Sequence, residues 1–188
     1  MPDLPAAVPI PLRGLPVVGV VIAALIAAIA TNKPWALNFF HVAGGGAWTA
    51  IDLFVGLFLG PIFGAMSPQA RAEFMARFMP KMLLLMPTLV TLTLGSGFQL
   101  ARHFGYLDPN SIHHAWVVAS FFLVGVMALI AIGVLEPANF AVLFEMRKDN
   151  PDVELIGRLM RRFIYTAGIT GVLQIGTLII MTRIPPGI

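Results

Sequence analysis

The amino-acid sequence predicts an all-α fold, a polytopic membrane bundle of five transmembrane helices in a single domain of 188 residues. The first observation is composition: 58% of the residues are hydrophobic and only 11% are charged, whereas soluble domains carry about 25% charged residues. The second is distribution, because the apolar residues form runs long enough to cross a bilayer, which takes about 20 helical residues. The chain is therefore expected to lie in a lipid bilayer.

The five spans are expected at residues 15–30, 35–65, 81–102, 112–135 and 158–181. The first follows Arg13 and ends in the triplet Ala28-Ile29-Ala30, a pattern that a cleavable secretory signal also shows. We interpret residues 1–30 as retained, with the first span added to a four-helix core that the other spans form.

Prolines and polar residues set the boundaries between the spans. Ser67-Pro68 is typical of a helix start, with serine as the N-cap and proline in the first turn, and it opens an amphipathic stretch before the third span. Pro137 predicts a kink near the end of the fourth span, with a helix continuing toward Lys148. Other breaks are expected at 31–34, 108–111 and 150–152.

Lysine and arginine are distributed unevenly between the two sides that five spans create. The N-terminal tail and the loops at 66–80 and 144–158 share one side, with nine of the 12 basic residues. These are Arg13, Arg71, Arg77, Lys81, Arg147, Lys148, Arg158, Arg161 and Arg162. Because basic residues concentrate in cytoplasmic loops, we expect a multi-pass protein of the inner (plasma) membrane, with a cytoplasmic N-terminus and a periplasmic C-terminus. The bias reports topology, and nucleic acid is not an expected partner.

The four histidines all fall at the outer ends of their spans under this topology. His41 lies roughly 9 Å below the outer edge, and His103, His113 and His114 lie at the interface. Imidazole binds metal ions and haem iron, so these side chains form a candidate cofactor or metal site; the alternative is that they only contact headgroups. Cysteine-held metals and clusters are excluded, since the chain has no cysteine.

Three consecutive glycines, Gly44 to Gly46, follow His41 inside the second span. A glycine costs about 1 kcal/mol relative to alanine inside a helix, so a reason for three is expected. They provide a surface without side chains, against which either another helix packs or a planar cofactor lies. Gly45 shares the face of His41, four residues earlier, and Trp48 is a candidate aromatic wall.

A matching face is predicted on the third span. Gly95, Gln99 and His103 recur at intervals of four residues and so share one side of the helix. Arg102 stands at the outer end of this span, where it would either pair with a haem propionate or extend toward the headgroups.

Asp52 lies three helical turns after His41 and projects from nearly the same face. A carboxylate near mid-membrane is costly, so we expect it to be protonated or hydrogen-bonded to threonines of the third span. Its role would be a proton relay, a substrate contact or a polar link between helices. The candidate partners are Thr88, Thr91 and Thr93.

Methionines recur at helical spacing on the side opposite the histidines, at positions 75, 79, 82 and 86. Thioethers bind Cu(I), but a methionine stripe is more often adaptable packing. One metal site cannot use both the methionines and the histidines, because they lie across the membrane from each other. We therefore interpret the stripe as packing.

The segment "HVAGGGAW" (41–48), a basic amphipathic loop and "MPTLVTLTLGSG" (86–97) together resemble small membrane proteins of the copper-resistance D (CopD) type. They are similar also to the HemJ-type protoporphyrinogen oxidases and the DUF2269 group, over about residues 36–183. The resemblance implies that His41 is a haem-b ligand or part of a metal or porphyrin site. The intramembrane lysine expected of a HemJ-type oxidase is not present beside His113-His114, which argues against porphyrinogen oxidase activity.

The functional hypothesis is a haem-b-binding membrane protein with an electron-transfer or redox role near the outer face. His41 would be one axial ligand, with His114, His113 or His103 opposite. As an enzyme it would be a membrane oxidoreductase, with a quinol or a periplasmic redox protein as partner.

Two alternatives belong to other classes. One is a copper or small-solute transport protein, with His41 and His114 as metal ligands or with a polar pathway past Asp52. The other is a non-catalytic membrane subunit whose glycines only pack helices, and the sequence also allows an oligomer.

The charge bias generates a test of topology. A reporter enzyme that works only after export should be active when fused at Ile188, and a reporter that works only in the cytoplasm should be inactive there. The same pair fused after Asn150 provides the control and should give the reverse result. An active cytoplasmic reporter at Ile188 would contradict the predicted topology.

Overall fold

The computed structural model describes residues 12–148 and 150–184, and all regular structure in these residues is helical. Five helical stretches are long and apolar enough to cross a membrane, which confirms the predicted all-α membrane bundle. Their bounds are Leu12–Thr31, Pro34–Ala65, Pro68–His103, His114–Glu145 and Val153–Met181.

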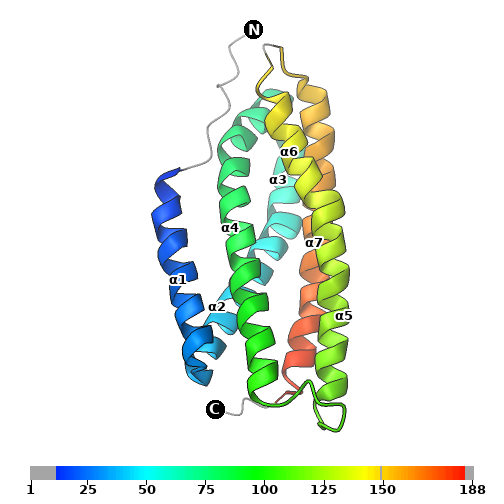
Figure 1. Cartoon of the computed structure of the whole chain (residues 1–188). Coiled ribbons are helices and arrows are strands. Elements are labelled where there is room, and N and C mark those ends of the chain that lie inside the picture. Colours follow the sequence, from blue (N-terminus) through cyan, green and yellow to red (C-terminus); the bar gives the residue numbers. More distant parts are fainter. Residues whose placement is uncertain (1–11, 149, 185–188) are drawn as a thin grey trace.

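Each stretch has its own elements (Figure 1). The first comprises η1 (Leu12–Gly14) and α1 (Leu15–Thr31), and the second α2 (Pro34–Leu53), η2 (Phe54–Leu59) and α3 (Gly60–Ala65). The third is α4 (Pro68–His103), the fourth comprises α5 (His114–Ile130), η3 (Ala131–Leu135) and α6 (Glu136–Glu145), and the fifth is α7 (Val153–Met181).

The third and fifth helices begin earlier than their predicted spans because polar side chains cap them. The Ser67 hydroxyl accepts a hydrogen bond from the backbone N–H of Ala70 at 3.3 Å, which confirms the predicted helix start. Asp152 accepts bonds from the backbone N–H groups of Glu154 and Leu155, both at 2.9 Å. Such caps satisfy N–H groups that the first turn of a helix leaves unpaired.

The second and fourth stretches each contain a π-helical segment just before a proline. Pro61 and Pro137 have no N–H, so the carbonyl groups four residues earlier lose their usual helical partner. The chain responds with the wider turns η2 and η3 and then continues as α3 and α6. The helix therefore extends past Pro137 to Glu145, as the sequence predicts.

The helices form an elongated bundle with two different ends. We call the end at residues 65–68 and 145–153 the basic end, because the cationic loops lie there, and the end at 31–34 and 103–114 the histidine end. In Figure 1 the basic end is at the top and the histidine end at the bottom.

The half of the bundle toward the basic end is tightly packed. Met75 and Met79 of α4 have no exposed surface and contact Ile156 and Met160 of α7, which are also buried. Residues of η2, α3 and α6 complete the same core. Met75 and Met79 of the methionine stripe are therefore buried packing, whereas Met82 and Met86 are half-buried.

Toward the histidine end the helices associate in pairs. α2 packs on α4, α5 packs on α7, and α2 also contacts α7, whereas α4 and α5 have no extended packing against each other. α1 lies outside this group and has only Leu25 and Ala28 buried, mainly against α4 (Figure 1). The arrangement confirms a four-helix core with an added N-terminal helix.

The second and fifth stretches touch backbone to backbone where η2 crosses α7. A Cβ atom placed on Gly56 would lie 2.3 Å from the Cα atom of Gly168, so any side chain at Gly56 would push the helices apart. We expect Gly56→Ala to lower the free energy of unfolding by about 1–3 kcal/mol, as overpacking of a core does. The measurement is unfolding in mixed micelles titrated with dodecyl sulfate and followed by circular dichroism.

Gly133 provides the matched control, because it lies in the other π segment and a Cβ there would meet nothing within 4 Å. Gly133→Ala should be neutral or stabilising by up to about 1 kcal/mol. Equal stability of the two variants would contradict the close crossing at Gly56.

Candidate functional site

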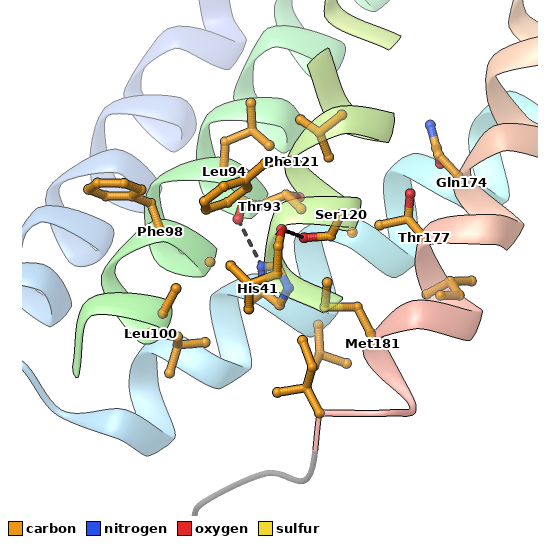
Figure 2. Close-up of a pocket in the computed structure, with 18 of the residues that line it drawn as sticks. His41, Thr93, Leu94, Phe98, Leu100, Ser120, Phe121, Gln174, Thr177 and Met181 are labelled. Atoms are coloured by element: carbon orange, nitrogen blue, oxygen red, sulfur yellow. Dashed lines mark hydrogen bonds between the residues drawn. The ribbon is translucent and has the colours of Figure 1, made fainter. Parts of the chain in front are cut away.

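A cavity of about 440 Å³ lies in the histidine-end half, where α2 and α4 face α5 and α7. Its wall is mostly apolar and includes the aromatic side chains of Trp48 and Phe104, together with Phe98 and Phe121, which Figure 2 labels. Among the described residues that line it, none is an aspartate, glutamate, lysine or arginine. Cavities of this size and character bind small molecules, and an uncharged wall favours a neutral ligand or one whose charge lies outside.

His41 is the one histidine in the described wall of this cavity. Its Nδ1 atom lies 2.9 Å from the carbonyl oxygen of Thr93 on α4, shown as a dashed line in Figure 2. A carbonyl oxygen only accepts hydrogen bonds, so Nδ1 must carry the proton and donate. In a neutral ring, Nε2 then holds the lone pair that accepts a hydrogen bond or binds a metal.

The imidazole of His41 lies against Gly97 of α4. A Cβ atom on Gly97 would come within 2.6 Å of the His41 Cε1 atom, so the position needs a residue without a side chain. Gly97, not Gly95, therefore provides the surface that meets His41. A Cβ on Gly95 would instead contact Leu25 of α1 at 3.5 Å.

The predicted second face of the site, formed by Gly95, Gln99 and His103, is not part of the cavity wall. The Gln99 side chain donates to the Asn32 Oδ1 atom at 3.0 Å, at the turn between α1 and α2. His103 is exposed and has its ring edge-on to Phe104. Gly95 and Gln99 therefore face α1 and the turn that follows it. Arg102 is exposed at the end of α4 and also lies outside the wall.

His113 and His114 lie at the histidine end, as predicted, but outside the cavity wall. The His113 ring packs edge-on against Tyr106, with ring centroids 4.9 Å apart. His114 Nδ1 lies 3.3 Å from the carbonyl oxygen of Tyr106. Within residues 12–148 and 150–184 no three or more His, Cys, Asp or Glu side chains gather into a group that would hold a metal.

The three glycines of α2 have different surroundings. A Cβ on Gly44 would lie 2.8 Å from the Thr93 Oγ1 atom, so this glycine allows α2 to approach α4 closely. Gly45 lines the cavity, yet a Cβ there would be 3.3 Å from the Thr93 Cγ2 atom. Gly46 also lines the cavity, and a Cβ there would meet nothing within 4 Å. Gly44 serves helix packing, and Gly46 leaves open space in the cavity.

Asp52 is buried, with 3% of its surface exposed, and links α2 to α7. Its Oδ2 atom accepts hydrogen bonds from the Thr170 hydroxyl at 3.0 Å and the Gln174 amide at 2.8 Å. The predicted partners on the third span were wrong, because those hydroxyls donate to carbonyl groups of their own helix. They are Thr88, Thr91 and Thr93.

Gln174 is the site residue that the sequence analysis missed. It is 4% exposed and lines the cavity from α7. Its Nε2 donates to Asp52, and its Oε1 has no hydrogen-bond partner in the described part of the chain. The available signal was an amide side chain within the apolar run 158–181, four residues after Thr170 and so on the same face of the helix.

We compared the chain with known proteins. No protein-family model matches it, and no curated protein or solved structure matches it significantly. The resemblance to the CopD and HemJ types therefore stays a prediction from the sequence.

The glycine environments predict opposite effects for two neighbouring substitutions. Gly44→Leu should destabilise the bundle by about 1–3 kcal/mol or more, because the side chain would collide with α4. Gly46→Leu should leave stability within about 1 kcal/mol while it reduces the space for a ligand. Thermal unfolding in detergent, followed by circular dichroism, measures both variants, and equal destabilisation would refute the assignment.

Proposed function

We propose that this chain is an integral membrane redox protein that binds its redox-active ligand in the cavity beside His41. One observation carries the proposal: the Thr93 carbonyl holds the imidazole with Nε2 as the acceptor, inside an uncharged cavity between four helices. A histidine oriented by a backbone carbonyl is the usual arrangement for a ring that binds a cofactor. Ionisable side chains inside a membrane are usually functional.

Haem b is the cofactor that the sequence predicts, and it would supply one-electron chemistry. His41 would hold the haem iron through Nε2, because the hydrogen bond from Nδ1 to Thr93 leaves that nitrogen free. The imidazoles predicted for the opposite position, His103, His113 and His114, lie outside the cavity wall, as does Arg102. Tyr106, Met127 and Met181 line the cavity and are the other described side chains there of a type that binds haem iron. The described wall thus fits haem b only in part.

Copper binding and solute transport have less support. In the described residues, no three or more histidine, cysteine, aspartate or glutamate side chains gather into a group that would bind copper. A transport path would have to continue from Asp52 toward the basic end, and that half is filled by buried apolar side chains. The alternative of a non-catalytic subunit accounts for the helix packing at Gly44. It gives no role to the cavity beside His41.

We propose further that the basic end faces the cytoplasm, which places the cavity near the outer face of the inner membrane. The nine basic residues lie on the side of the chain that this end occupies, and they include Arg13 at the start of the first stretch. A redox partner would then be a component of the bilayer or a periplasmic protein.

The spectrum of the purified protein tests haem binding. If haem b is the ligand, the protein purified from cells with ample haem should show a Soret band, and elemental analysis should find iron. His41→Ala should lose most of the band, because it removes the axial ligand that the structure supports. His103→Ala is the control, since His103 is exposed at the helix end, and it should keep the band.

A preparation without iron and without a Soret band would exclude haem b. Copper found in place of iron would favour the transport alternative. A cavity that takes up no redox compound would exclude the proposed function as a whole.

A further inference from the structure

We propose that the cavity recognises a lipid-soluble quinol, a neutral ring with two hydroxyl groups, through two acceptor atoms: Nε2 of His41 and Oε1 of Gln174. The inference rests on the proposed function, because it concerns the same cavity, and it names the class of ligand. Its starting point is the incomplete fit to haem b.

The first acceptor is fixed by the backbone of α4. The carbonyl oxygen of Thr93 accepts a hydrogen bond from Nδ1–H at 2.9 Å, which leaves the lone pair on Nε2. A neutral imidazole in this tautomer accepts a hydrogen bond from a ligand hydroxyl. Gly97 leaves room for the ring in this position, because a larger residue would overlap it.

The second acceptor is fixed by Asp52 of α2. The aspartate accepts a hydrogen bond from the Gln174 Nε2 atom at 2.8 Å, so the other atom of the amide, Oε1, points away from the carboxyl group. This oxygen is buried and lacks a partner in the residues that the structure describes, and its side chain lines the cavity. An unpaired buried acceptor is costly, and a donor on a ligand in the cavity would satisfy it.

The rest of the wall indicates that the ligand is neutral and aromatic. None of the described lining residues carries a formal charge at neutral pH if His41 is neutral. Haem b has two carboxylates and no hydrogen-bond donor on its ring edge, so it would leave Gln174 unsatisfied. A quinol has an apolar ring and two hydroxyl groups, which can donate one hydrogen bond to each of the two acceptors.

Access from the bilayer is consistent with such a ligand. Phe98 of α4 and Phe121 of α5 line the cavity with ring centroids 6.3 Å apart, and both are partly exposed on the outer surface of the bundle. Because α4 and α5 have no extended packing, these rings stand between the cavity and lipid. A quinol dissolved in the bilayer would enter between them and stack on an aromatic face.

The acceptor pair predicts selectivity between oxidation states. A quinol donates two hydrogen bonds, whereas the matching quinone carries only acceptors and would oppose both atoms. Blocking both hydroxyls as methyl ethers also removes the donors while it keeps the ring and the tail. Binding should therefore fall in the order quinol, then quinone or dimethyl ether.

The experiment measures binding of a decyl-substituted benzoquinol, its quinone and its dimethyl ether to the full chain in detergent, by equilibrium dialysis under anaerobic conditions. We expect the quinol to bind at least about tenfold more tightly than the ether, since each lost hydrogen bond to a buried acceptor weakens binding severalfold. This comparison uses the unaltered chain, so it decides the question even if a variant fails to fold.

Variants then assign the two acceptors. Gln174→Leu and His41→Phe should each reduce quinol binding about tenfold and leave ether binding nearly unchanged. Gln99→Leu and His103→Ala are matched controls outside the cavity wall and should bind quinol as the unaltered chain does. Circular dichroism establishes that each variant compared is folded.

Each outcome has a defined meaning. Equal binding of quinol and ether in the cavity, reduced alike by Gly46→Leu, would overturn the recognition of hydroxyl groups and leave the proposed function standing. Haem bound on His41 that excludes quinol would do the same. If the protein holds no haem and binds none of the three compounds, both this inference and the proposed function fail.

Discussion

The contact between the second and fifth stretches determines which half of the bundle is filled and which is open. Gly56 and Gly168 bring the two backbones together at η2, and the hydrogen bonds of Asp52 to Thr170 and Gln174 join them one turn away. Beyond this point α2 runs toward α1 and α4, while α7 stays beside α5 (Figure 1). The cavity occupies the space that this separation creates.

The fold and the position of residues along the long axis of the bundle could be predicted from the sequence. Both depend only on distance along the chain, at a fixed rise per helical residue. Run length locates a span, and the Ser67 cap and Pro68 locate a helix start. The common depth of the histidines follows from counting residues from each span end. These quantities need no knowledge of which helix lies next to which.

The lateral arrangement could not be predicted, because periodicity identifies a face of a helix and not the neighbour that covers it. Gly95 and Gln99 share a face, as expected, but α1 covers it. Asp52 has threonines available on two helices, and it bonds Thr170 because the second stretch meets α7 close by, at Gly56 and Gly168. Gln174 becomes a site residue only once that pairing orients its amide.

The two π segments, η2 and η3, change the direction in which the faces of the second and fourth spans point. Each wide turn adds one residue without adding height, which rotates everything beyond it by about 100° around the helix axis. The lipid-facing stripe before Phe54 is therefore out of phase with the stripe after Leu59, and the same holds on either side of η3. One span thus presents two independently oriented surfaces, so that its basic-end half packs in the core and its histidine-end half borders the cavity.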